Sequence, residues 1–390
     1  MRDLVRVENR GNLVVANIAD MHFGALDPKT QYELLKTQII DELNKLPILD
    51  IIGLLGDFFD RRGMSDSDAT LYGQMLMSDI RQVAINKNAS VVILMGTKQH
   101  DADQMRLFYH YLSDPEFDIR IVETIKFEYV KGAKILCIPE LYGLDEKVYQ
   151  NFLSFSGGYD MCFMHGTIKG AIYGDNAGLS RLFTIEDFKN CLGPIFAGHV
   201  HTAGCFNSDI YYCGSPLRWK FGEEQEKGYM ICLYNMDTRK YYTTLIPVYS
   251  FRYDTVNIDE IISQDPKDVI EYINTLKEEG IDYLRLSITK EVPTEDMNII
   301  KEYYRNNGHI KFKLARNTDS ITSSDISQSN EFSNYAYLFD NSLSEYDKLG
   351  IYIKSKEGIM IPGETIKQIV ENDDFDYSTV NLVKENNDEV

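Results

Sequence analysis

Five apolar runs of strand length occur in the first half of the chain, and polar residues follow each of them directly. The runs are rich in β-branched residues and end at a Gly or an Asp, as buried strands do. Apolar residues at helical spacing lie between the first runs, from Tyr32 to Leu43 and from Leu71 to Val83. This alternation predicts an α/β fold with a parallel or mixed sheet. The strands are expected at residues 13–19, 48–55, 91–95, 161–164 and 194–197.

The pattern changes after residue 250, where a shorter set of elements begins. Strands are predicted at 251–256, 283–289 and 309–314, with helices at 266–279 and 294–306, which together form a small α+β unit. A polar stretch rich in Ser, Thr and Asn follows it. We therefore divide the chain into a main domain 1–249, a cap domain 250–316, a linker 317–335 and a C-terminal segment 336–390. That segment includes a helix-like stretch at 364–371.

The histidines are concentrated in the polar clusters behind the apolar runs. The chain has seven histidines, and five of them lie in these clusters. Ligands of open α/β sheets bind beyond the carboxyl ends of the strands, so the clusters should converge on one site. A histidine at a strand end is commonly just a satisfied polar residue, but the repeated order makes chance a poor explanation. The clusters are Asp20–His22, Gly56–Asp60, Gly96–Asp101, His165–Thr167 and Gly198–His201.

These side chains predict a particular chemistry. Imidazole and carboxylate without thiolate suit Mn²⁺, Fe²⁺ or Zn²⁺. Asp57 is placed to bridge two ions, which lie about 3.5–4 Å apart in two-metal sites. Such a pair activates a water as hydroxide and clamps both oxygens of an in-line displacement. Hydrolysis of a phosphate ester is the reaction that requires this geometry.

Composition narrows the cellular setting. The formal net charge is −20 over 390 residues, which argues against nucleic-acid binding by a general basic surface. Six cysteines occur without a Cys-x-x-Cys pair, which is typical of reduced thiols in a cytosolic protein. No apolar run approaches the roughly 20 residues of a membrane helix. The N-terminus lacks the apolar stretch of a secretory signal. We expect a cytoplasmic protein that does not enter the membrane.

The order of the clusters resembles the motif series of the calcineurin-like metallophosphoesterases. The series is Asp-x-His, Gly-Asp-x-x-Asp, His-Asp, His-Gly and Gly-His-x-His, and the resemblance covers roughly residues 12–247. Gly214-Ser215-Pro216 and the run from Phe221-Gly222-Glu223 to Gly228 are similar to the SbcD branch, the nuclease subunit of the SbcC–SbcD DNA-repair complex. The resemblance implies two packed mixed β-sheets flanked by helices, with residues 250–316 as a DNA-binding cap.

The resemblance also implies roles for individual residues. The first metal ion would be held by Asp20, His22, the bridging Asp57 and His201, and the second by Asp57, His165 and His199. His100 would protonate the leaving oxygen, as a histidine can near neutral pH, and Asp101 would orient it.

One loop departs from the family pattern. The family has Gly-Asn-His-Asp, with Asn as a ligand of the second metal, where this chain has Gly96-Thr97-Lys98-Gln99-His100-Asp101. We expect Gln99 to replace the Asn, which would loosen the second site and require millimolar Mn²⁺. Two alternatives stay open: Thr97 faces the site, or the second site is weak.

The leading interpretation is a DNA nuclease, acting as an exonuclease, an endonuclease or both in DNA repair or recombination. Its cofactors would be two divalent ions, Mn²⁺ before Mg²⁺, Fe²⁺ or Zn²⁺. Its partners would be DNA, an SbcC-like ABC-type ATPase bound by the C-terminal segment, and a second copy of the chain bound through helices near 66–86 and 102–113. The setting would be the cytosol of a prokaryotic cell, including one infected by a phage. Expected DNA contacts are Arg61, Arg62, Arg218 and Lys220.

Two other functions compete with the nuclease. A phosphodiesterase or phosphatase acting on nucleotides or other small substrates would explain the acidic charge more simply, although it would need neither cap nor tail. A metal-binding scaffold with weakened catalysis is supported only by the altered loop at Gly96–Asp101, and His100 counts against it.

Overall fold

The computed structural model describes residues 12–61, 67–101, 104–141, 143–171, 182–258, 265–288, 293–314, 343–357, 359–362, 364–367 and 383–384. Contacts divide the chain into two units. One comprises Met1–Ser287 with Val292–Lys313, and the other Ile288–Glu291 with Leu314–Val390. Each unit is described by itself.

The first six-stranded sheet has the strand order β14-β13-β1-β2-β3-β4. The strands β1 to β4 are parallel, and the edge pair β13 and β14 runs antiparallel to its neighbours. The sheet is therefore mixed, as the sequence predicts. Its strands are β1 (Asn12–Ile18), β2 (Ile51–Leu55), β3 (Ser90–Leu94), β4 (Ile119–Val122), β13 (Gly228–Asn235) and β14 (Tyr241–Pro247).

The second six-stranded sheet has the order β11-β12-β10-β7-β6-β5. Its four inner strands are parallel, and both edge strands are antiparallel. The strands are β5 (Lys126–Val130), β6 (Ala133–Ile138), β7 (Met161–His165), β10 (Ile195–Gly198), β11 (Gly204–Asn207) and β12 (Ile210–Tyr212). Between β7 and β10 in the chain, β8 (Thr167–Ile168) and β9 (Leu182–Phe183) form a short parallel pair of their own.

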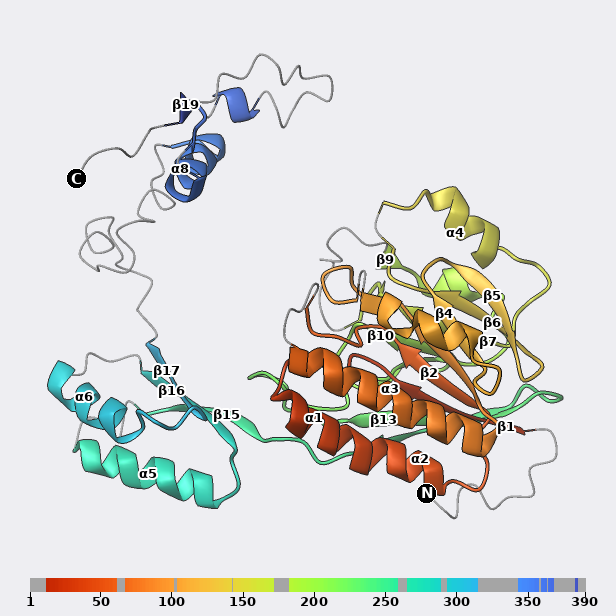
Figure 1. Cartoon of the computed structure of the whole chain (residues 1–390), viewed down its shortest axis with the longest axis horizontal. Helices are drawn as coiled ribbons and strands as arrows, with labels where there is room; N and C mark the ends of the chain where they lie inside the picture. The colour runs from red at the N-terminus through yellow and green to blue at the C-terminus, as the bar shows by residue number, and fades with distance from the viewer. Residues whose placement is uncertain are drawn as a thin grey trace. The chain divides into compact units, whose positions relative to one another are not determined.

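The two sheets pack face to face with helices outside them. Because strand residues alternate between faces, Val15 of β1 packs with Phe163 of the second sheet, while Val14 packs under the helices. Helices α1 (Pro28–Leu35), α2 (Asp41–Lys45) and α3 (Ser67–Lys87) cover the first sheet, and α4 (Glu146–Leu153) covers the second (Figure 1). The predicted fold of two mixed sheets flanked by helices is confirmed.

The two predicted helices of the main domain are present. Leu35, Ile39 and Leu43 are buried along α1, a π-helical turn Lys36–Ile40 and α2. In α3 the prediction is wrong for Leu71 and Met75, which are 52% and 38% exposed. The first turns of α3 face Phe59 through small residues, so these two larger side chains point outward.

The cap elements follow the predicted order. A three-stranded sheet has the order β15 (Tyr253–Asn257), β16 (Tyr283–Ile288) and β17 (Ile310–Leu314). Helices α5 (Pro266–Glu278) and α6 (Thr294–Tyr303) accompany it, and Asp265 caps α5 by accepting the N–H of Lys267. The contact division leaves β15, α5 and most of the cap in one unit with the main domain.

The predicted linker 317–335 lies outside the described residues. In the C-terminal segment the structure describes α8 (Glu345–Glu357) and an antiparallel pair of β18 (Ile359–Met360) with β19 (Val383–Lys384). The predicted helix 364–371 is helical over 364–367, and its remainder lies outside the described residues. Among the helices that the structure describes, none combines the length and the apolar character needed to cross a membrane.

Candidate metal centre

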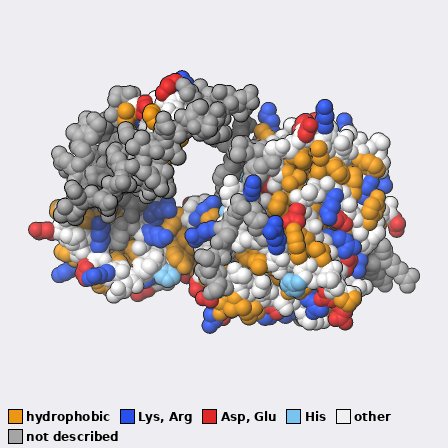
Figure 2. All heavy atoms as spheres, turned by 45° about the horizontal axis from the view of Figure 1, so that its top comes forward, with side chains coloured by type: hydrophobic (Ala, Val, Ile, Leu, Met, Phe, Trp, Pro, Cys, Tyr) orange, Lys and Arg blue, Asp and Glu red, His pale blue; other side chains and the backbone are white. Residues whose placement is uncertain are grey.

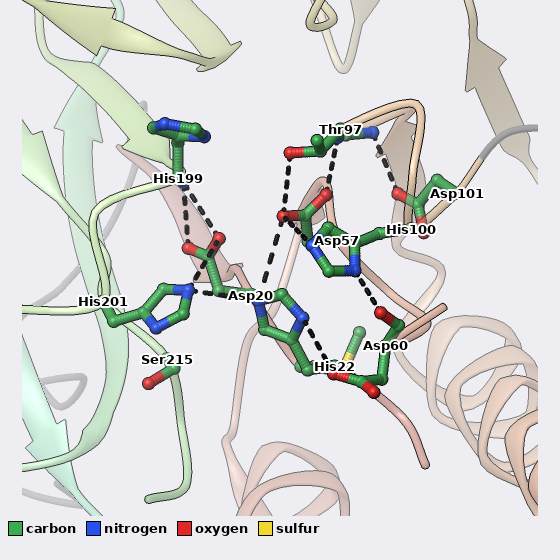
Figure 3. A network of polar contacts seen from close by, with 12 residues as sticks. Asp20, His22, Asp57, Asp60, Thr97, His100, Asp101, His199, His201 and Ser215 are labelled. Carbon is green, nitrogen blue, oxygen red and sulfur yellow. Dashed lines mark hydrogen bonds and ion pairs between the residues drawn. The ribbon is translucent and has the colours of Figure 1, made fainter. Parts of the chain in front are cut away.

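The predicted clusters converge at the carboxyl ends of strands from both sheets. Asp20 and His22 follow β1, Asp57 follows β2, and His199 follows β10. Figure 3 shows the side chains of Asp20, His22 and Asp57 lying close together, while the backbone N–H of His199 donates to the carboxylate of Asp20. The structure thus brings together every predicted ligand except Gln99: Asp20, His22, Asp57, His165, His199 and His201.

The backbone at these strand ends is tightly bent. Asp20, His22, Asp57 and His199 all have positive φ, from 45° to 87°. This conformation is uncommon for residues other than Gly, and such residues cluster at functional sites. Gly56 completes the turn, because a Cβ there would lie 2.3 Å from Nδ1 of His165. These bends therefore position the side chains of the centre and lie beyond the hydrogen-bonded part of the sheet.

The first half of the centre is built on two facing imidazoles. Nε2 of His22 lies 3.1 Å from Nε2 of His201. Nε2 of His22 is 3.8 Å from Oδ2 of Asp57, and Nε2 of His201 is 4.0 Å from Oδ1 of Asp20. Burial lowers the pKa of His22 to about 2, so its ring is neutral. Two ring nitrogens and two carboxylates pointed at one place form a set of donors that suits a divalent cation.

His201 is oriented by a buried acid–base pair behind it. Its Nδ1 donates to Oε1 of Glu223 at 2.8 Å, which leaves the lone pair on Nε2 for the centre. Nζ of Lys227 lies 3.4 Å from Oε2 of Glu223 and donates to the carbonyl of His201 at 3.1 Å. Glu223 and Lys227 both lie in the run Phe221–Gly228 that resembles the SbcD branch, and their spacing of four residues already permits an ion pair.

The second half of the centre includes a residue that sequence analysis missed. Nε2 of His165 is 3.4 Å from Oδ2 of Asp57 and 3.5 Å from Oε2 of Glu140, and Nδ1 of His199 is 3.3 Å from that same Oε2. Nδ1 of His165 donates to the carbonyl of Leu55 at 2.7 Å, so Nε2 faces the centre. Asp57 thus lies in contact with histidines of both halves.

The charges of this half depend on one another. Burial disfavours the ionised Glu140, but the hydrogen bond from His199 and the nearby His165 outweigh it and lower the pKa of Glu140 to about 2. Burial likewise opposes protonation of His165, but Asp57 outweighs it and raises the pKa of His165 well above its usual value. Within the described residues, Nε2 of His165 and Nδ1 of His22 are buried without a hydrogen-bond partner. Buried polar atoms of this kind call for a partner, and a metal ion bound at Nε2 would supply one for His165.

His100 lies at the edge of the centre, but its predicted partner is wrong. Its Nε2 is 4.0 Å from Oδ2 of Asp57, and 27% of its side chain is exposed. The carbonyl of Asp60 accepts from Nδ1 of His100. Asp101 instead accepts the N–H of Gly96 at 2.9 Å and of Phe59 at 3.2 Å, so it holds loops together rather than orienting the ring. Burial, with Asp57 nearby, raises the pKa of Asp101 to about 7.

Gln99 is exposed, and Glu140 lies where the amide ligand of the second metal was expected. Glu140 comes after the apolar strand β6 and Pro139, so it has the same pattern of an apolar run followed by a polar residue as the predicted clusters. This cluster contains no histidine, so the pattern of histidines after apolar runs did not single it out.

The predicted DNA contacts do not share one environment. Arg61 is exposed and pairs with Asp60 at 3.1 Å, whereas Arg62 lies outside the described residues. Arg218 donates to the backbone carbonyls of Glu223, Glu224 and Gln225, so it stabilises that loop. Lys220 is half-exposed, with Nζ 4.4 Å above the ring of Trp219. Figure 2 shows Lys and Arg interspersed with acidic side chains on the face drawn.

Comparison with known proteins assigns the chain to no family. No family model matches the chain, and no curated protein matches it. One similar crystal structure has 10% identity and a TM-score of 0.37, covering 60% of this chain and 99% of that one. A glutamine-dependent NAD⁺ synthetase from Acinetobacter baumannii in complex with ADP has 10% identity and a TM-score of 0.26, covering 89% of this chain and 71% of that one. Both TM-scores are too low to carry an inference about function.

Proposed function

We propose that this chain is a dinuclear metal-dependent phosphodiester hydrolase that cleaves DNA. The observation that supports it most is the position of Asp57. Its Oδ2 lies 3.8 Å from His22 of the first half, 3.4 Å from His165 of the second half and 4.0 Å from His100. A carboxylate shared by two donor sets, with a partly exposed histidine at its edge, is the arrangement that two-metal hydrolysis of phosphate esters requires.

The residues of the centre have separable roles in this proposal. Two divalent ions, Mn²⁺ before Mg²⁺, Fe²⁺ or Zn²⁺, would supply Lewis-acid polarisation of the phosphate and an activated water. Asp20, His22 and His201 would hold the first ion, His165 and His199 would hold the second, and Asp57 would contact both. His100 donates its Nδ1 proton to the carbonyl of Asp60, which leaves Nε2 to carry the proton that the leaving oxygen needs.

The larger assembly is part of the same proposal. Lys220 and Arg61 are exposed near the centre and would contact the phosphates of DNA. Exposed apolar side chains on α3 and on the 3₁₀ helix Gln104–Ser113 support a dimer through this face. The segment 336–390 would bind an SbcC-like ABC-type ATPase in DNA repair or recombination in a prokaryotic or phage-infected cytosol.

The experiment that tests the proposal compares two substrates. Metal-depleted protein is supplied with Mn²⁺ and given end-labelled double-stranded DNA or a chromogenic phosphodiester. We expect cleavage of both, and a loss of about 10²–10⁴-fold with His100→Ala, the range that a general acid contributes. His110→Ala is the matched control, because His110 is an exposed histidine of the 3₁₀ helix Gln104–Ser113.

Each outcome decides between functions. Turnover of the small ester with DNA left intact, in the presence of the ATPase partner as well, would refute the nuclease and favour a small-substrate phosphodiesterase. If Mn²⁺ binds but neither substrate is cleaved even with the partner, the chain is a metal-binding scaffold. Equal activity of His100→Ala and wild type would refute the role of His100.

A further inference from the structure

A carboxylate occupies the part of the second metal position where an amide was expected. We propose that Glu140 is a direct ligand of the second metal ion and takes the place predicted for Gln99. This inference rests on the proposed dinuclear centre, but it concerns a residue that the sequence pattern did not assign.

The geometry converges on one oxygen of Glu140. Its Oε2 lies 3.3 Å from Nδ1 of His199, 3.5 Å from Nε2 of His165 and 3.0 Å from Oγ1 of Thr97. The Glu140 side chain is 2% exposed, so it points into the protein rather than to solvent. The donor atoms of Glu140, His165 and His199 all lie within 4.8 Å of one another. An ion bound among these atoms could be contacted by all three side chains without any movement of the strands that carry them.

The backbone fixes Glu140 in this position. The N–H of Glu140 donates to the carbonyl of Met95 at 3.2 Å, which joins the end of β6 to the end of β3, strands of different sheets. Residue 140 is therefore held beside the loop Gly96–Asp101, the loop whose two extra residues leave Gln99 in solvent. The longer loop removes Gln99 from the second metal position, and the acidic residue after β6 takes its place there.

Thr97 shows that the carboxylates of Asp57 and Glu140 approach the same point. Its Oγ1 is 3.1 Å from Oδ2 of Asp57 and 3.0 Å from Oε2 of Glu140. A hydroxyl has one proton, so it can donate to only one of the two carboxylate oxygens. The other oxygen then faces a lone pair of Oγ1, with the imidazole of His165 beside both carboxylates. A divalent ion coordinated by Asp57 and Glu140 would bind at this point, where two carboxylates approach one hydroxyl.

The exchange of amide for carboxylate changes the chemistry of the site. Two divalent ions carry four positive charges; Asp20, the shared Asp57 and Glu140 would compensate three of them, whereas with Gln99 in place of Glu140 only two would be compensated. Carboxylate oxygens suit Mn²⁺ and Mg²⁺ well. The second site should therefore bind Mn²⁺ tightly, the opposite of the loose, millimolar binding that a glutamine ligand led us to expect.

Metal binding by itself tests the assignment. Metal-free wild type, Glu140→Ala, Glu140→Gln and Gln99→Ala are titrated with Mn²⁺ by calorimetry, and the fluorescence of Trp219 is followed in parallel. Trp219 is the single tryptophan and its ring lies 4.8 Å from that of His22 and 5.3 Å from that of His201, so it reports the first site. Gln99→Ala is the matched control, since Gln99 is the ligand that the sequence predicted.

We expect two Mn²⁺ per chain in wild type and in Gln99→Ala. In Glu140→Ala the second ion should bind at least about 100-fold more weakly, and in Glu140→Gln about 10–100-fold more weakly, while the Trp219 response to the first ion persists. That persistence shows that the variant is folded; if it is lost in Glu140→Ala, the isosteric Glu140→Gln decides.

Two results would overturn the assignment: unchanged binding of two ions by Glu140→Gln and Glu140→Ala, or loss of the second ion in Gln99→Ala. Wild type that binds fewer than two ions also overturns it. Because the experiment measures metal binding and not activity, its result is independent of the proposed function. If wild type binds two ions and Glu140→Ala binds one, but neither protein cleaves a substrate, the assignment of Glu140 as a ligand stands and the proposed hydrolase is rejected.

Discussion

Replacing Lys227 by Met should destabilise the protein through a buried charge pair. The Lys227 side chain is 1% exposed, and its Nζ lies 3.4 Å from Oε2 of Glu223 and 2.7 Å from Oγ of Ser215. Methionine fills a similar volume without the charge. The carboxylate of Glu223, itself only 5% exposed, would then lose its nearest cation while Nδ1 of His201 still donates to it.

The magnitude follows from what is left uncompensated. Removing one partner of a buried ion pair costs about 3–5 kcal/mol, because the other charge stays buried. Glu223 keeps His201 as a donor and the N–H of Trp219 at 3.4 Å, so we expect the low end, about 3 kcal/mol. His201 would also lose part of its support, and such losses behind a metal ligand weaken metal binding about 10–100-fold.

Denaturant unfolding of metal-free protein, followed by the emission of Trp219, measures the effect. Lys220→Met is the matched control: Lys220 is 51% exposed and its Nζ is 3.9 Å from Oε1 of the same Glu223. An exposed pair of this kind contributes about 0–1 kcal/mol. Adding Glu223→Gln to Lys227→Met should recover about 1 kcal/mol or more, since it removes the stranded charge. Equal losses from Lys227→Met and Lys220→Met would refute the reasoning.

Two further predictions concern pH and assembly. Asp101 has a raised pKa of about 7 in the folded state against 3.8 for an ordinary Asp, so its contribution to stability is present below pH 3.8 and is lost as the pH rises toward 7, by up to about 4 kcal/mol. Asp101→Asn removes this titration, so in EDTA its deficit in unfolding free energy relative to wild type should shrink over that range, and a constant difference would contradict the prediction. If the chain dimerises through the 3₁₀ helix Gln104–Ser113, Leu112→Asp, at a side chain 55% exposed, should halve the mass measured by light scattering and leave monomer stability within about 0.5 kcal/mol. Tyr129→Asp, at another exposed apolar position on β5, should leave the mass unchanged, and so should Leu112→Asp if the wild type is already a monomer.

Much of the centre could be predicted because its signals are local. A strand that ends in a polar cluster places its last side chains at the sheet edge, and parallel neighbours bring such edges together. Asp20, Asp57 and His165 each follow or end a buried strand, so their convergence follows from the order of apolar runs. The alternation of strands and helices predicted an α/β fold with a parallel or mixed sheet, whereas the arrangement as two packed mixed sheets was implied by the resemblance to the metallophosphoesterases.

Which side chains contact each other within the site became known only from the tertiary structure. Glu140 meets Thr97 because the second sheet packs against the first in one particular position, which no local spacing encodes. His100 is oriented by the carbonyl of Asp60, a backbone atom that every residue type offers and that sequence cannot single out. The sequence by itself determined which strand ends carry the donors. Only the packing of the two sheets decided which donors face each other, because those distances are set by contacts between residues far apart in the chain.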